Sequence, residues 1–287
     1  MSERAGLKPV PEGQLRVAYQ GEPGAYSEDA LHRFFGEPQA DPAPCPSIRE
    51  VFEQVEIRSV DYGVVPLENS QAGSINETYN LLLRHGVRLV GQVVISVDHA
   101  LLALPGATLA DIRKVYSHPQ ALAQCEEFLS QLVGVEAVPA LDTAGAAKRI
   151  ADDGRKDQAA VAGRRAAELY GLSILAEGIQ TYPQNYTKFG VIGEPSSRFG
   201  EPDTTSIVFA VSDVPGSLLR CLEPFAQRGI NLHKIESRPQ AARPWRYSIY
   251  LDFQAAAEDP KAVEALAEMA DHTSFVRVLG TYRAWQD

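Results

Sequence analysis

The sequence predicts an α/β protein built from two domains. Its 287 residues correspond to about two domains, and 45% hydrophobic with 22% charged residues is typical of a globular chain. From residue 15 to residue 192, apolar strand patterns alternate with helix patterns, which indicates a largely parallel sheet or sheets. A segment rich in Gly, Pro and Ser follows at 193–203, and the pattern changes beyond it, so we place the linker there.

Several helices of the first domain have recognisable starts or ends. The helix at 47–55 opens on a capping box of Ser47 and Glu50, and the helix at 74–86 opens on a second one of Ser74 and Glu77. A loose tail is expected at 1–14. In chain order, strands are expected at 15–19, 62–68, 87–97, 99–105, 114–118, 135–140, 158–163 and 188–192, and helices at 27–36 (closed by Gly36), 47–55, 74–86, 119–132, 143–154 and 164–171.

The second domain follows the order βαββαβ. Its helix at 215–229 begins at Pro215 and ends at Gly229. The strand at 245–254 alternates strictly and places Trp245, Tyr247, Ile249, Leu251 and Phe253 on one face. The other elements are strands at 205–211, 230–239 and 275–282 and a helix at 260–271. This order is that of a ferredoxin-like sandwich.

The net charge limits the possible binding partners, and the cysteines limit the possible cellular compartment. The net charge is −10, and there is no run of Lys or Arg, so we expect no nucleic-acid binding. Cys45, Cys125 and Cys221 lie far apart, which favours a reducing compartment. Because the start of the sequence lacks a signal-peptide pattern and no apolar run approaches about 18 residues, we expect a cytoplasmic protein that is not bound to a membrane.

No cofactor or metal is expected from the motifs. The sequence contains no G-x-S-x-G, H-E-x-x-H, Walker A or G-x-G-x-x-G pattern, and its six histidines are scattered. A reaction carried out without a cofactor has to be driven by the substrate itself once that substrate is held in place.

Polar residues follow three strand patterns of the first domain, in "YGVVPLENSQAGS" (62–74), "VYSHPQALAQC" (115–125) and "NYTKFGVI" (185–192). Ligands of α/β sheets bind beyond the carboxyl ends of the strands, so these residues are candidates for one pocket. The candidates are Glu68, Asn69, Ser70, Ser117, His118, Gln120 and Gln124, with Ser27 in "GAYS" and with Thr143 at a helix N-terminus that favours an anion. Each also has a structural interpretation as a turn, a helix cap or a strand residue, so the residues alone indicate only a site for something polar.

The three segments also carry a resemblance. "DYGVVPLENSQAGSINETYNLL", "YSHPQALAQC" and "GIQTYPQNYTKFGVI" resemble the signature of bacterial prephenate dehydratases, and "PGSLLRCLEPFAQRGINLHKIESRP" (215–239) is similar to the phenylalanine-binding region of their ACT domain. The resemblance implies a catalytic domain at 15–195 with two α/β lobes, like a type 2 periplasmic binding protein. The lobes would comprise about 15–95 plus 188–195, and about 96–187. An ACT domain would follow at 204–284.

The same resemblance implies the reaction and its residues. Enzymes of the family convert prephenate to phenylpyruvate, water and carbon dioxide, without a cofactor. The family's essential threonine falls on Thr187, which we interpret as a donor to the departing hydroxyl. The other implied catalytic residues are Glu68, Asn69, Ser117 and Gln124, and the expected substrate-binding residues are Ser27, Ser70, Thr143, Lys188 and Phe189. Lys188 stands where the family usually has arginine, so the two-pronged guanidinium is absent there.

The ACT resemblance implies regulation by phenylalanine and assembly into a homodimer or homotetramer. The expected phenylalanine-binding residues are Gly216, Ser217, Leu218, Asn231, Leu232, Glu236, Ser237 and Arg238. Two alternatives stay open. One is an arogenate dehydratase, whose substrate has an ammonium in place of the ketone of prephenate, and the other is a sensing protein that has lost catalysis.

Overall fold

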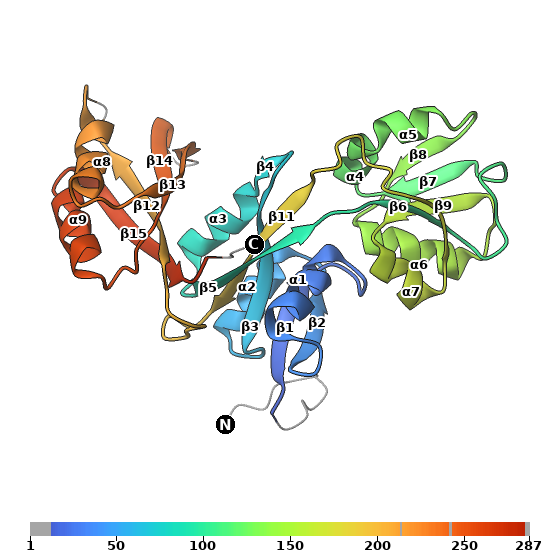
Figure 1. Ribbon diagram of the computed structural model, residues 1–287, viewed down its shortest axis with the longest axis horizontal. Coiled ribbons are helices and arrows are strands. Elements are labelled where there is room, and N and C mark those ends of the chain that lie inside the picture. The colour runs from blue at the N-terminus through green and yellow to red at the C-terminus, as the bar shows by residue number, and fades with distance from the viewer. Residues whose placement is uncertain (1–12, 213, 241–242, 285–287) are drawn as a thin grey trace. The chain divides into compact units, whose positions relative to one another are not determined.

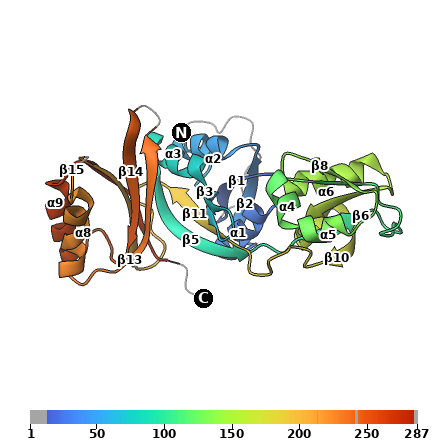
Figure 2. The same ribbon diagram turned by 90° about the horizontal axis from the view of Figure 1, so that it is seen from above.

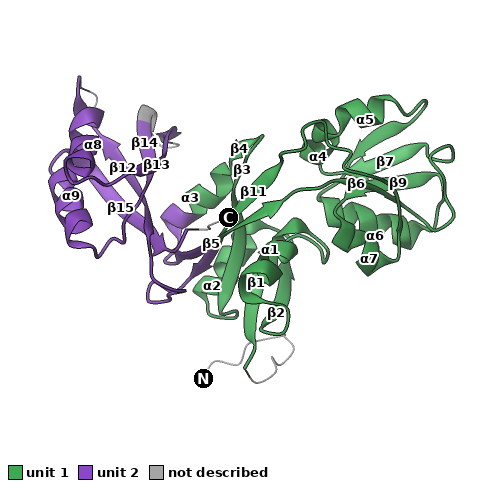
Figure 3. Cartoon of the chain, viewed as in Figure 1, with its two compact units in different colours: residues 1–81, 93–190 green, residues 82–92, 191–287 purple. Residues whose placement is uncertain are grey.

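The computed structural model describes residues 13–212, 214–240 and 243–284, apart from the side chains of 240–246. The expected tail at 1–14 therefore lies almost wholly outside the described residues, as does the expected position of the Trp245 side chain. The chain forms two compact units, residues 1–81 with 93–190 and residues 82–92 with 191–287 (Figure 3). Among the described residues, no helix is long and apolar enough to cross a membrane.

The first lobe of unit 1 is built around a parallel sheet. Its elements are β1 (Leu15–Gln20), α1 (Tyr26–Phe35), β2 (Ala40–Cys45), α2 (Ile48–Glu56) and β3 (Tyr62–Asn69). Strand β1 pairs in parallel with both β2 and β3. Helix α2 has the expected N-cap, because the amide of Glu50 donates to Ser47 Oγ at 3.2 Å, and α1 ends at Gly36 as expected.

Strand β2 has no counterpart among the expected elements. Its sequence, ADPAPC, contains Pro42 and Pro44, which have no N–H to donate to a neighbouring strand. Among the described strands, β2 pairs only with β1 and thus forms an edge of the sheet. Two prolines spaced two residues apart fit such an edge, since both nitrogens can face away from the neighbouring strand.

The chain crosses between the two lobes twice, after β5 (Arg88–Ser96) and before β11 (Tyr186–Gly193). Where these segments meet, the Val97 amide donates to the Asn185 carbonyl at 2.8 Å. Helix α3 (Asn76–Arg84) begins later than expected, because Ser74 pairs with Glu68 as part of the short strand β4 (Gly73–Ser74).

The second lobe of unit 1 has a mixed sheet in the order β10-β6-β9-β7-β8, with helices on both faces (Figure 1). Strand β6 is antiparallel to β9 and β10, and the other pairs are parallel. The elements are β6 (Ala100–Ala103), β7 (Lys114–Ser117), α4 (Pro119–Gln124), α5 (Glu126–Ser130), β8 (Glu136–Pro139), α6 (Thr143–Asp153), β9 (Gln158–Ala162), α7 (Arg164–Tyr170) and β10 (Ser173–Glu177). The single helix expected at 119–132 is divided at Cys125, and β10 was not expected.

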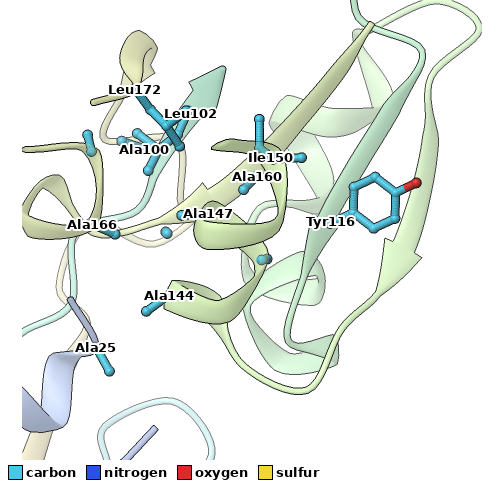
Figure 4. Close-up of a cluster of buried hydrophobic side chains, with 13 residues drawn as sticks. Ala25, Ala100, Leu102, Tyr116, Ala144, Ala147, Ile150, Ala160, Ala166 and Leu172 are labelled. Carbon is cyan, nitrogen blue, oxygen red and sulfur yellow. The ribbon is translucent and has the colours of Figure 1, made fainter. Parts of the chain in front are cut away.

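Alternating residues of β6 and β9 explain why this sheet is covered on both faces. Leu101 and Val161 belong to one buried cluster, which Leu122 of α4 joins, whereas Leu102 and Ala160 belong to the other. The second cluster consists mainly of alanines from β6, β9, α6 and α7 (Figure 4), whose small side chains allow the helices to pack close to the sheet. The two-residue period of a strand thus buries both faces.

Most of unit 2 is a βαββαβ sandwich, as the sequence predicts. Its antiparallel sheet has the order β13-β14-β12-β15, and α8 and α9 cover one face (Figure 2). The elements are β12 (Thr204–Val211), α8 (Ser217–Gln227), β13 (Leu232–Gln240), β14 (Arg243–Phe253), α9 (Pro260–Ala270) and β15 (Thr273–Tyr282). Ile249, Leu251 and Phe253 are buried against these helices as expected, whereas Tyr247 is 45% exposed.

Unit 2 also holds the end of α3 and the start of β5. Arg277 of β15 donates to the carbonyls of Leu83 and His85, which lie at the C-terminal end of α3. Gly280 pairs in parallel with Leu89, and a Cβ at Gly280 would lie 2.2 Å from the Leu89 carbonyl oxygen. The strand β15 can therefore approach β5 this closely only with glycine at position 280.

Candidate active site

A cavity of about 330 Å³ lies in unit 1 at the ends of strands and helices from both lobes. Eight of the residues expected from the sequence line it, namely Ser27, Asn69, His118, Gln120, Gln124, Thr143, Thr187 and Phe189. Thr187 and Phe189 alternate with Lys188 along β11, so the two lining residues share one face of the strand and half-buried Lys188 lies outside the lining. The exchange of the family's arginine for Lys188 thus falls outside the cavity wall.

Asn69 fixes the orientation of the Thr187 hydroxyl. The Oδ1 atom of Asn69 accepts from the amides of Gln71 and Ala72 at 3.1 and 3.0 Å. This assigns Nδ2 as the atom that faces Thr187, and it donates to Thr187 Oγ1 at 3.0 Å. Because Oγ1 accepts this bond, the hydroxyl proton of Thr187 can be donated to a group in the cavity.

The same network continues through the buried amide of Asn185 and the half-buried amide of Gln124. Asn69 Nδ2 also donates to Asn185 Oδ1 at 2.8 Å, and Asn185 Nδ2 donates to Gln124 Oε1 at 3.2 Å. With Oε1 of Gln124 accepting inside the network, its Nε2 group is left as a donor for a ligand in the cavity. Asn69, Gln124 and Thr187 are thus held in one set of orientations.

His99 extends the network to the first helix of the chain. Its Nε2 lies 3.0 Å from Gln124 Oε1, which only accepts, so Nε2 carries a proton. Its Nδ1, which then carries no proton, lies 3.2 Å from the hydroxyl of Tyr26, and the one proton of that hydroxyl is shared between Nδ1 and the Asp98 carbonyl at 2.8 Å. Burial lowers the pKa of His99 and raises the pKa of Tyr26, which favours the neutral form of both side chains.

Three residues of this network, Tyr26, His99 and Asn185, are not among the site residues expected from the sequence. Tyr26 lies inside the "GAYS" segment that was expected at the rim, and Asn185 lies directly before the threonine motif. His99 had a weaker signal, as the first residue of an apolar strand pattern. Only the pairing of distant segments places it beside Gln124.

Three of the remaining expected residues hold the surrounding strands instead. Ser117 is fully buried, and its hydroxyl donates to the Val161 carbonyl at 2.6 Å, which ties β7 to β9. Ser70 accepts from the Tyr186 amide at 3.0 Å through its hydroxyl oxygen. Glu68 lies opposite Ser74 in the β3–β4 pair. None of these three lines the cavity.

The helix N-terminus at Thr143 was expected to attract an anion, but the structure places a carboxylate beside it. Asp142 precedes Thr143 as the N-cap of α6, and its Oδ1 accepts from the Gly145 amide at 2.6 Å. The helix end that was expected to attract an anion therefore already has a carboxylate, whose pKa burial raises. By contrast, α1 has no side-chain cap, and its first residues, Tyr26 and Ser27, line the cavity.

The residues expected to bind phenylalanine lie in two places in unit 2. Gly216, with φ of 79°, precedes α8, and Ser217 and Leu218 open that helix. Asn231 and Leu232 line a separate hollow of about 630 Å³. Arg238 is buried over the ring of Tyr250, and its guanidinium donates to both carboxylate oxygens of Glu236 at 3.0 and 3.1 Å. Ser237 lies between them on β13 and is exposed.

A two-lobed α/β domain with a polar cavity, followed by a βαββαβ module, defines a class of two-domain proteins. Within that class, the chain belongs to the prephenate dehydratase family, whose model matches residues 17–197, and the model of the ACT domain matches residues 205–271. It is thus an enzyme of the hydro-lyase type, with an ACT domain after its catalytic domain.

Plant proteins are among the curated relatives. Arogenate dehydratase 1 of Petunia hybrida is 48% identical over 297 residues, which cover 96% of this chain and 69% of the relative. A chloroplastic protein of Arabidopsis thaliana, named arogenate dehydratase/prephenate dehydratase 1, is 43% identical over 287 residues, which cover 94% of this chain and 72% of that protein. The expected restriction to bacterial enzymes is therefore not confirmed.

Two solved structures share the fold over most of the chain. Prephenate dehydratase from Arthrobacter aurescens in complex with L-Phe has a TM-score of 0.85 and 29% identity, and the match covers 94% of this chain and 90% of that one. GqqA, described as a novel type of quorum quenching acylase, has a TM-score of 0.84 and 32% identity, with 94% and 98% covered.

Proposed function

We propose that this enzyme converts prephenate to phenylpyruvate in the cavity of unit 1. The observation that carries the proposal is the Thr187 hydroxyl, which Asn69 orients as a donor toward the cavity. In the reaction, the electron pair of the ring–carboxylate bond enters the ring as carbon dioxide leaves and the C–O bond breaks. The departing oxygen takes up a proton and leaves as water, and the aromatic ring that forms supplies the driving force.

In this proposal, the side chains that line the cavity have different roles in the reaction. Thr187 donates a hydrogen bond to the departing oxygen and stabilises the charge that develops there. Gln124 Nε2 and the Ser27 hydroxyl are donors for substrate carboxylates. Glu68, Ser70 and Ser117 act from outside the cavity wall by holding β3, β7 and β11 in place, and Lys188 also lies outside that wall. The two lobes would comprise about 15–95 plus 188–195, and about 96–187, with the ACT domain at 204–284.

We further propose that phenylalanine inhibits the enzyme from the ACT domain, at the residues expected from the sequence. The support is the ACT match and the L-Phe complex of the Arthrobacter protein. We infer a homodimer or homotetramer through β13, which is an edge strand and carries Ile235 at 51% exposure.

Three free, buried cysteines support a reducing compartment, for which we propose the cytoplasm.

Arogenate is a second candidate substrate, because the names of both plant relatives include arogenate dehydratase. Turnover of prephenate and arogenate, each with and without phenylalanine, tests the catalytic and regulatory proposals together. Formation of phenylpyruvate or phenylalanine that falls on adding phenylalanine is the expected result. A folded protein that binds phenylalanine but turns over neither substrate would be a sensor instead.

A further inference from the structure

The cavity wall has an unusual charge for a site that receives an anion. Of the described residues that line it, none is Lys or Arg, and Asp142 is the one Asp or Glu among them. Prephenate carries two carboxylates and a ketone. Arogenate has the same ring and the same two carboxylates, but an ammonium replaces the ketone. The wall therefore offers one carboxylate, and only the second substrate has a cation to pair with it.

The Asp142 carboxylate has capacity to bind a cation. Its Oδ1 accepts from the Gly145 amide, and the remaining lone pairs of a carboxylate can take further donors. No Lys or Arg forms an ion pair with it among the described residues. Lys148 lies within electrostatic range, but it is hydrogen-bonded to Glu22 at 2.8 Å.

The charges around Asp142 do not supply a replacement for a substrate cation. Glu22 and Lys148 form an ion pair with each other, so their charges largely offset, and His118, which also lines the cavity, is kept toward its neutral form because burial lowers its pKa. A partly buried carboxylate without a cationic partner costs desolvation energy, which a bound ammonium would offset.

We propose that Asp142 determines specificity by binding the α-ammonium of an amino-acid substrate, so that the cavity prefers arogenate to prephenate. The inference rests on the proposed dehydratase function and adds a residue to it. Asp142 has two roles, as the cap of α6 and as the partner of the substrate ammonium. These roles can be separated, because asparagine and serine also cap helices but carry no charge.

The test compares kcat/KM for arogenate and prephenate in the full chain, Asp142→Asn and Asp142→Ser. The unaltered enzyme is expected to favour arogenate. Both variants are expected to lower the arogenate-to-prephenate ratio about tenfold or more, which is typical of a lost charged hydrogen bond. The loss should fall mainly on the KM for arogenate, with prephenate turnover kept or improved. Using two variants keeps the test decisive if one fails to fold.

Asp259→Asn provides a matched control. Asp259 is the N-cap of α9 in unit 2 and accepts from the Lys261 amide at 2.8 Å, so its exchange removes the same charge from the same kind of position. Its substrate ratio should equal that of the unaltered enzyme. An unchanged ratio in both Asp142 variants, with both substrates still turned over, would overturn the role of Asp142 alone. Turnover of neither substrate by the unaltered enzyme would overturn the proposed function, and this inference with it.

Discussion

Asn69 Nδ2 donates to Thr187 Oγ1 at 3.0 Å, although the two residues are 118 positions apart in the sequence. Asn69 ends β3 and Thr187 is the second residue of β11, so the bond joins two strand ends beside the cavity. The amides of Gln71 and Ala72 hold the other end of the Asn69 side chain. A threonine with an oriented hydroxyl is thereby fixed before any substrate arrives, as electrostatic stabilisation of a leaving group requires.

Thr187→Ala is expected to keep the fold and lower kcat by about two to three orders of magnitude, which is typical of removing one oriented donor. Thr187→Ser is the control, because it keeps the hydroxyl and should retain much more of the activity. Steady-state turnover and circular dichroism of both variants check this prediction. Near-normal kcat in the alanine variant would remove Thr187 from the mechanism.

Asn69→Asp is expected to lower kcat nearly as much as Thr187→Ala does. The new carboxylate keeps the acceptor for the two backbone amides but loses the donor, so the Thr187 hydroxyl would turn to donate to it instead of to the substrate. The variant should also be destabilised, because Asn185 Oδ1 loses the bond from Asn69. Turnover close to that of the unaltered enzyme would show that the hydroxyl orientation does not matter.

His99 is expected to make folding stability fall in mild acid. Burial lowers its pKa in the folded state, so the unfolded chain binds a proton more readily. The stability that depends on neutral His99 is present above the unfolded pKa of about 6.5 and is lost as the pH falls toward the lower, folded pKa. His118 shifts in the same direction and adds to the effect.

Thermal unfolding of His99→Gln from pH 7.5 to pH 5 tests this expectation. The variant should lose less of its Tm on acidification than the unaltered enzyme. Equal pH profiles for the unaltered enzyme and His99→Gln would contradict the expectation.

Gly280→Ala is expected to lower the free energy of unfolding by about 1–3 kcal/mol or more, because the added Cβ would lie 2.2 Å from a backbone oxygen that cannot move aside easily. Gly134→Ala is the comparison, since no other atom lies within 4 Å and only the φ of 74° opposes a side chain. Denaturant unfolding of both variants measures the difference. A smaller loss at Gly280 than at Gly134 would contradict the close approach of β15 to β5.

The sequence predicts the local structure of this chain well. The helix caps at Ser47 and Gly36 and the βαββαβ order of the second domain are confirmed, because each depends on residues close in the sequence. Strand β2 is missed because two prolines argue against a strand unless it lies at an edge. Whether a strand lies at an edge is set by its neighbours, which local patterns do not contain.

The candidate site was predictable only in part. By itself, the sequence determined which strand ends carry polar residues, and through its motifs it determined the family. Tertiary structure alone decided that Ser117 ties two strands together, that His99 joins Gln124, and that Asp142 lines the cavity. The physical reason is that a hydrogen bond requires atoms about 3 Å apart. Ser117 and Val161 are 44 residues apart and His99 and Gln124 are 25 residues apart, so each pair reaches that distance only once the chain has folded.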